Sequence, residues 1–136
     1  MTYYGQLACN NINPGGNFEL KDESFFDKDY EKEFKKNKLI RHIILLKELN
    51  ATQLGKDIFK HLADLKSEKG SEVLAAELAS SVERYDFAIQ ISKKASYEKR
   101  FYNQFNYPII ATPKIIKNKV MPKAEVVLAI IRQESE

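Results

Sequence analysis

The sequence is poor in the residues that interrupt secondary structure. Only five glycines and four prolines occur among its 136 residues. Glycine and proline mark most turns, so their scarcity leaves few breaks and favours long helices over a many-stranded sheet. No apolar run approaches the roughly 20 residues that a membrane-crossing helix needs, and we therefore expect no membrane span.

Cysteine is almost missing as well, because Cys9 is the only one. A single cysteine builds no disulfide framework and no thiolate metal site. We expect Cys9 to be a buried, inert thiol. His42 and His61 fall on separate predicted helices with no metal-ligand spacing between them, and the sequence has no glycine-rich phosphate loop. The sequence predicts neither a metal nor a cofactor.

Apolar and charged residues are abundant, at 43% and 30% of the chain, and the net charge is +3. Basic and acidic residues alternate through most of the sequence, which is typical of solvated helix faces. A basic tilt from Lys93 to Lys123 also contains aromatic residues, a mixture that nucleic-acid surfaces use. No base-reading motif accompanies it, and the aromatics have core-like spacing. We therefore predict a solvated surface here and no nucleic-acid partner.

Helical periodicity begins close to the N-terminus. The pattern predicts a helix over Thr2–Ile12 that ends at the turn Asn13–Gly16, and a second helix between Asp22 and Asn37. Asn50 with Gln53 resembles a capping box for a following helix. That helix should bury Leu54, Ile58, Phe59, Leu62 and Leu65.

Between Leu39 and Ser96 the apolar spacing predicts four helices of about 10 to 14 residues each, close to the average length. Gly70-Ser71 separates two of them, and Asp86 is a candidate cap for the last. Short joints imply antiparallel neighbours. The expected fold is all-α, with helix pairs that form a bundle or an α-superhelix. The predicted core comprises Ile43, Leu46, Ile58, Leu62, Leu74, Leu78 and Ile91.

The last part of the sequence has a different texture. Pro108 disfavours helix at Tyr107, Thr112-Pro113 is a helix-start pair, and Met121-Pro122 starts a final helix. That helix contains six consecutive apolar residues, Val126–Ile131. Such a run covers the whole circumference of a helix, which belongs at the centre of a domain.

The end of this last helix is acidic. Glu134, Glu136 and the terminal carboxylate crowd a helix C-terminus, where the dipole favours cations. Together with the apolar run, this predicts a truncated domain. In the chain alone, Val126–Ile131 is expected either to stay exposed to solvent, to dock on the preceding helices or to drive self-association.

Ala124–Ser135 resembles the first catalytic motif of the soluble lytic murein transglycosylases, in which an apolar helix ends in Arg-Gln-Glu-Ser. Tyr107-Pro108 and the turn Pro113–Asn118 are similar to the stretch before that motif. Thr2–Ala8 is similar to the point where the family's helical superhelix continues into a linker. The resemblance implies a superhelix or linker region over residues 1–107 and the start of a lysozyme-like catalytic domain over residues 108–136.

The resemblance implies a single catalytic carboxylate, Glu134. In the family, this glutamate protonates the glycosidic oxygen between N-acetylmuramic acid and N-acetylglucosamine, and the sugar's own 6-hydroxyl then closes a 1,6-anhydro ring. Ser135 matches a serine that helps to hold a Gly-Leu-Met-Gln-like loop. Neither that loop nor the family's Ala-Tyr-Asn-like motif occurs in this sequence. The chain is therefore expected to be a fragment that is inactive alone.

The partner implied by this family is the glycan strand of peptidoglycan, and the full-length parent would work in the periplasm or cell envelope. Residues Met1–Leu7 contain no basic region followed by an apolar stretch, so no signal peptide is recognisable. Two alternatives to the transglycosylase interpretation stay open. In the first, Glu134 is only a solvated residue at a helix end. In the second, the chain is a free-standing helical-repeat module that binds a protein partner.

Overall fold

A computed structural model describes residues 3–15, 24–109 and 122–134, and these residues form helices without any β-strand. The all-α prediction is confirmed at this level. Whether the helices belong to a superhelix, and whether a lysozyme-like domain begins at residue 108, stay predictions. The helices in chain order are α1 (Tyr3–Ile12), α2 (Lys28–Lys35), α3 (Lys38–Glu48), α4 (Lys56–Asp64), α5 (Ser71–Ser81), α6 (Tyr85–Tyr97), α7 (Asn103–Asn106) and α8 (Ala124–Glu134), with 3-10 turns η1 (Thr52–Gly55) and η2 (Ser67–Lys69).

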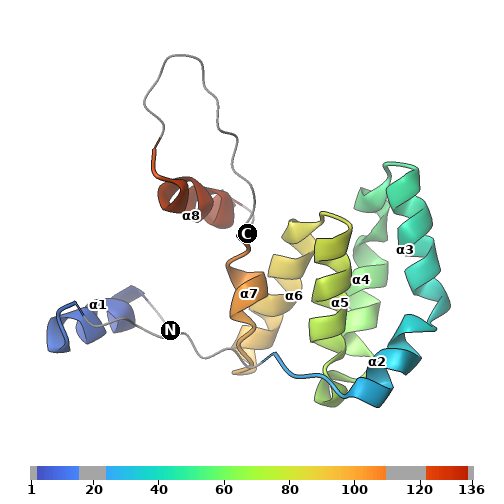
Figure 1. Cartoon of the computed structure of the whole chain (residues 1–136), viewed down its shortest axis with the longest axis horizontal. Helices are drawn as coiled ribbons and strands as arrows, with labels where there is room; N and C mark the ends of the chain where they lie inside the picture. The colour runs from blue at the N-terminus through green and yellow to red at the C-terminus, as the bar shows by residue number, and fades with distance from the viewer. Residues whose placement is uncertain (1–2, 16–23, 110–121, 135–136) are drawn as a thin grey trace.

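The helices α3 to α6 lie side by side and alternate in direction, with α2 across one end and α7 beside α6 (Figure 1). We call residues 24–109, which contain α2 to α7, the helical body. Helix α5 packs against both α4 and α6, so it lies at the centre of this arrangement. The expected antiparallel neighbours are present, because the joints between consecutive helices are short.

Two helices of the body begin with side-chain caps. The Asp27 carboxylate accepts hydrogen bonds from the backbone N–H groups of Asp29 and Tyr30 at 2.8 and 3.1 Å. The Asn37 side chain accepts one from the Leu39 N–H at 3.0 Å. These bonds satisfy donors that a helix start leaves unpaired. The sequence had predicted a helix from Asp22, but helix α2 starts at Lys28.

The two caps that the sequence predicted for the body are wrong. Asn50 has a left-handed backbone with φ of 52° and lies at the end of α3, and no side chain caps η1. Asp86 is the second residue of α6, so it is not the N-cap, and its carboxylate binds the guanidinium of Arg84. This pairing with Arg84 lowers the pKa of Asp86.

Three helices end in the same way without glycine. After α3, α5 and α6 the chain passes through Asn50, Glu83 and Lys99, each with a positive φ. The next N–H group reaches back five residues in every case: Ala51 to Leu46 O, Arg84 to Ala79 O and Arg100 to Ala95 O, at 2.8, 2.9 and 3.1 Å. This is the Schellman ending, in which glycine is the usual left-handed residue. The chain therefore forms the Schellman ending three times with Asn, Glu or Lys in the position that glycine usually occupies.

Gly70 is the residue between η2 and α5, and its position requires glycine. Its φ is +86°, and a Cβ atom there would lie 2.3 Å from the carbonyl oxygen of Phe25. The approach brings residues 24–27 against η2, where the Asp27 N–H donates to the Lys69 carbonyl at 3.0 Å. Gly70 thus lets the N-terminal part of the body pack against the start of the central helix. Its place between η2 and α5 agrees with the break that the sequence predicted at Gly70-Ser71.

The core prediction is largely confirmed. Ile43, Leu62, Leu74 and Ile91 are buried, while Leu46, Ile58 and Leu78 are partly buried and pack against the same cluster. Leu54 and Leu65, predicted for the buried face of α4, are instead 71% and 40% exposed. They lie on either side of the α-helical part of that segment, in η1 and just after Asp64, so they leave the helical stripe.

Helices α1 and α8 can also be compared with the predictions from the sequence. Cys9 on α1 is exposed, so the prediction of a buried thiol is wrong. The predicted final helix is present, but it begins at Ala124, two residues after the predicted first-turn position Pro122. The turn expected at Thr112-Pro113 lies outside the described residues. Among the helices that are described, none combines the length and the apolar character needed to cross a bilayer.

Truncation of Leu62 tests the core. Its side chain has no exposed surface, so Leu62→Ala should lower the free energy of unfolding by about 2–5 kcal/mol, through lost burial and a residual cavity. Leu54→Ala is the matched control, and because Leu54 is exposed the loss should stay below about 0.5 kcal/mol. Urea unfolding followed by circular dichroism measures both. Equal losses in the two variants would contradict the assignment of the core.

Candidate functional site

The predicted catalytic residue Glu134 is the last residue of α8, and it is exposed. On the same helix Val126 and Ile130 are 50% and 58% exposed. Helix α8 starts where the N–H groups of Val126 and Val127 bond to the Lys123 carbonyl, at 3.0 and 3.2 Å. Ser135, the other residue of the predicted motif, lies outside the described residues.

A general acid that serves a glycosidic bond keeps its proton because an apolar cleft surrounds it. Glu134 has no such cleft in the described part of the chain, since its side chain faces solvent. In the described structure it is therefore a surface carboxylate at a helix end. The arrangement supplies a possible acid but neither the walls nor the sugar subsites that catalysis requires.

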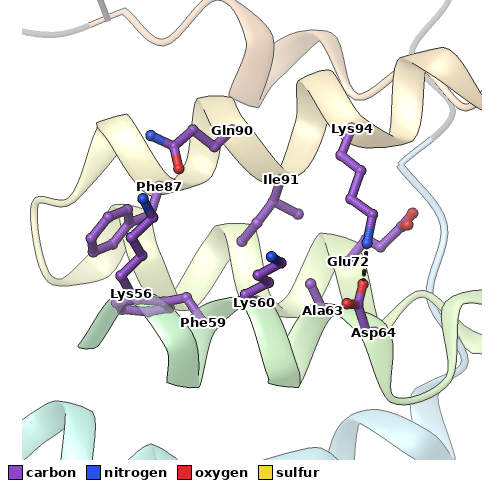
Figure 2. A pocket seen from close by; sticks show the side chains of 10 residues that line it. All are labelled: Lys56, Phe59, Lys60, Ala63, Asp64, Glu72, Phe87, Gln90, Ile91 and Lys94. Carbon is purple, nitrogen blue, oxygen red and sulfur yellow. Dashed lines mark hydrogen bonds and ion pairs between the residues drawn. The ribbon is translucent and has the colours of Figure 1, made fainter. Parts of the chain in front are cut away.

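A second candidate site, which the sequence did not predict, lies between α4 and α6. It is a groove of about 310 Å³ that we call the α4–α6 groove. Figure 2 shows α4 and α6 running along its two sides. Its lining residues are Lys56, Phe59, Lys60, Ala63, Asp64, Glu72, Phe87, Gln90, Ile91 and Lys94.

The floor of the groove is apolar, and its rims are charged. Phe59 and Phe87 meet with ring centroids 5.3 Å apart, and both are buried. At one end the Lys94 ammonium of α6 binds the Asp64 carboxylate of α4 at 2.6 Å, as the dashed line in Figure 2 shows. Lys56 and Lys60 line the groove from α4, and neither makes an ion pair with any residue that the structure describes.

A buried ionic cluster lies behind one end of the groove. Glu72, in the first turn of α5, is 4% exposed. It accepts two hydrogen bonds from the Arg100 guanidinium, at 3.0 and 2.8 Å, and one from the Tyr102 hydroxyl, at 3.0 Å. Arg100 also binds Glu98 at 2.6 Å. Because Glu72 is fully engaged in these bonds, we interpret it as a structural residue rather than a reactive one.

This cluster also changes the titration of its members. Burial and the neighbouring Glu72 carboxylate raise the pKa of Tyr102 to about 12. The hydrogen bonds to Glu72 raise the pKa of the Arg100 guanidinium. Both shifts favour the protonation state that already holds at neutral pH, so the cluster keeps its bonds across the physiological range.

Several residues considered at the sequence level are not brought together. His42 bonds to the Lys38 carbonyl within α3, while His61 lies exposed on α4. No group of three or more possible metal ligands occurs in the described ranges. In the basic tilt, Lys94 and Arg100 are engaged in ion pairs, and Tyr102 and Phe105 belong to the core.

Two sequence signals could have indicated the α4–α6 groove and the Glu72 cluster. Lys56 and Lys60 are four residues apart, so they share one face of a helix beside the apolar stripe. Glu72 stands directly before a run of small and apolar residues, Val73–Ala76. A buried carboxylate at the start of such a helix requires a cationic partner, but that partner, Arg100, is 28 residues away.

Comparisons of the chain with models of protein families, with curated proteins and with solved structures find no match. The resemblance to lytic transglycosylases therefore depends on the sequence motif alone. The assignment of Glu134 stays a prediction.

The tyrosine of the Glu72 cluster gives a test by pH. An unfolded tyrosine loses its proton near pH 10, whereas folded Tyr102 keeps it until about pH 12. The stability from this group is fully present below pH 10 and is lost as pH rises toward 12, by on the order of 2 kcal/mol. Tyr102→Phe should lack this component, so its urea stability should fall less steeply over that interval. Tyr97→Phe, at a 77% exposed position, should follow the wild type. Parallel curves for all three proteins would contradict the assignment.

Proposed function

We propose that this chain is part of a soluble lytic murein transglycosylase and that Glu134 is the acid–base group of that enzyme. The support is the run Ala124–Ser135, in which an apolar helix leads directly into Arg-Gln-Glu-Ser. The position of Glu134 at the end of α8 is compatible with this role, because a helix end can present a carboxylate to a neighbouring cleft.

The proposed reaction needs only one carboxyl group. Glu134 gives its proton to the oxygen that joins N-acetylmuramic acid to N-acetylglucosamine, and the bond from that oxygen to C1 breaks. The 6-hydroxyl of the muramic acid then attacks C1 and returns its proton to Glu134. The products are a 1,6-anhydro sugar and a free N-acetylglucosamine end, and no water is consumed. Most glycoside hydrolases use two carboxylates, because one of them must activate water or act as a nucleophile.

The exposed apolar side of α8 fits the same proposal. Val126 and Ile130 are four residues apart, so they lie on one side of the helix, and both are at least half exposed. An apolar surface of this kind is usually covered by a partner. We propose that further parts of a catalytic domain cover it in the active enzyme and would enclose Glu134 at the same time.

A second candidate function is a helical module that binds a protein. The α4–α6 groove favours this function, because it has an apolar floor and cationic rims. A peptide can offer both an apolar side chain and carboxylates to such a groove, which suits it better than a glycan. The two functions are compatible in one protein, since α8 and the groove lie on different elements.

The catalytic proposal predicts that the 136-residue chain releases no anhydro-muropeptides from purified peptidoglycan. Exposed Glu134 is in water, and general acid catalysis contributes only about 10²–10⁴-fold even when the acid is well placed. A protein that also contains the sequence encoded after Glu136 should be active, and Glu134→Gln in that protein should abolish release. Mass spectrometry of the soluble products measures this. Glu125→Gln, on the same helix, is the matched control and should retain activity.

Three results would refute the proposal. The first is a stop codon directly after Glu136. The second is anhydro product from the 136-residue chain itself. The third is an extended protein that keeps its activity after Glu134→Gln.

The exposed side of α8 predicts self-association in the 136-residue chain. Analytical ultracentrifugation across a concentration series should show a monomer–oligomer equilibrium, because association removes Val126 and Ile130 from water. The double variant Val126→Lys with Ile130→Lys should shift the chain to monomer. Ile12→Lys, at a position that is 84% exposed on α1, should leave the equilibrium unchanged. A wild-type chain that stays monomeric at every concentration would refute association through α8.

A further inference from the structure

The α4–α6 groove has dimensions that restrict its ligand. Its volume is about 310 Å³. Small-molecule sites span about 300–1,000 Å³, so this groove lies at the lower end. A groove of this volume accommodates one large side chain with a short length of backbone.

The floor of the groove selects an apolar group. Ala63, Phe87 and Ile91 line it together with Phe59, and all four are buried, so only small parts of their surfaces face the groove. An apolar side chain placed there leaves water at a gain of about 25 cal/mol for each Å² that it buries.

The rims select an acidic ligand. Asp64 is neutralised by Lys94 at 2.6 Å, and Glu72 is neutralised by Arg100 at 2.8 Å. Lys56 and Lys60 are exposed and have no acidic partner among the described residues. The groove therefore carries two uncompensated positive charges, one helical turn apart on α4. Gln90, on the opposite rim, offers both an amide donor and an acceptor.

We propose that the α4–α6 groove binds an acidic peptide segment that carries a large apolar side chain. The apolar side chain enters between Phe59 and Ile91, and neighbouring carboxylates of the peptide pair with Lys56 and Lys60. Gln90 hydrogen-bonds to the peptide backbone. This combination of an apolar anchor and a charged rim follows the usual division of peptide interfaces, in which the anchor supplies affinity and the rim supplies selectivity.

A nucleic acid fits the same groove poorly. Single strands bind by stacking their bases flat on exposed aromatic faces. The Arg84 guanidinium covers the Phe87 ring at 3.9 Å from its centroid, and that ring also packs against Phe59. Without a free ring face, the cationic rim alone would attract phosphates but could not order the bases.

Peptide selection on the intact chain tests the proposal. A phage-displayed library of random short peptides is selected against the immobilised protein, and an enriched peptide is then synthesised with a fluorescent label. The selected sequences should share one large apolar residue flanked by Asp or Glu. Replacing the apolar residue by alanine, or the acids by their amides, should each weaken binding about tenfold or more, as measured by fluorescence anisotropy.

Charge reversal on the protein supplies the matched comparison. Lys56→Glu with Lys60→Glu should weaken binding of the selected peptide by about tenfold or more. Lys28→Glu with Lys38→Glu changes the net charge equally at the exposed first residues of α2 and α3, and it should leave affinity unchanged. Circular dichroism checks that both variants keep their helices. If the reversed groove unfolds, Lys60→Gln alone provides the test, with a smaller loss expected.

Chemical-shift mapping of backbone amides should place the peptide on α4 and α6. The proposal is overturned if the selection enriches no acidic, apolar-bearing sequence. It is also overturned if both double variants weaken binding equally, because that would mean unspecific attraction by net charge. A single-stranded oligonucleotide that displaces the peptide and shifts the same amides would assign the groove to nucleic acid instead. These outcomes do not depend on peptidoglycan cleavage, so the groove and the catalytic proposal can fail separately.

Discussion

The neutralisation of Glu72 is the interaction on which the rest of the helical body depends. A carboxylate removed from water costs several kcal/mol unless charged and polar partners replace the lost hydration. Arg100 and Tyr102 supply those partners, and the position of Glu72 in the first turn of α5 adds the favourable end of the helix dipole. The bonds hold the segment after α6 against the start of α5. Helix α5 can then be covered on several sides, and Tyr102 and Phe105 close the end of the core.

The α4–α6 groove follows from the same central helix. Helix α5 carries small buried residues, Ala75, Ala76 and Ala79, which let α4 and α6 approach it closely. The two outer helices then lie near each other, joined at one end of the groove by Lys94 and Asp64 and below it by Phe59 and Phe87. The space left between them keeps an apolar floor, because the rings of Phe59 and Phe87 serve as core below and as groove lining above.

Helical periodicity was sufficient to predict the fold class and most of the core, because the stripe through Ile43, Leu62, Leu74 and Ile91 is a local property of the sequence. Caps were less predictable. Asn50 and Asp86 are good cap residues, but the choice depends on whether a helix is ending nearby and on whether Arg84 competes for the carboxylate. The Glu72 cluster and the α4–α6 groove join residues about 30 positions apart, and no local pattern specifies such pairs. Glu134 is the reverse case: its motif is visible in the sequence, whereas the described residues form no apolar cleft around it.

The sequential packing of the helices has a consequence for the speed of folding. Helix α5 packs mainly on α4 and α6, its neighbours along the chain, and folding rates rise as contacts become more local. Helix pairs of this kind can form independently and join within micro- to milliseconds. The bonds from Arg100 and Tyr102 to Glu72 must close a loop of 28 to 30 residues, which carries a larger entropic cost. This closure should follow the pairing of α4, α5 and α6, so that mutations in the cluster mainly accelerate unfolding and leave the rate of folding almost unchanged.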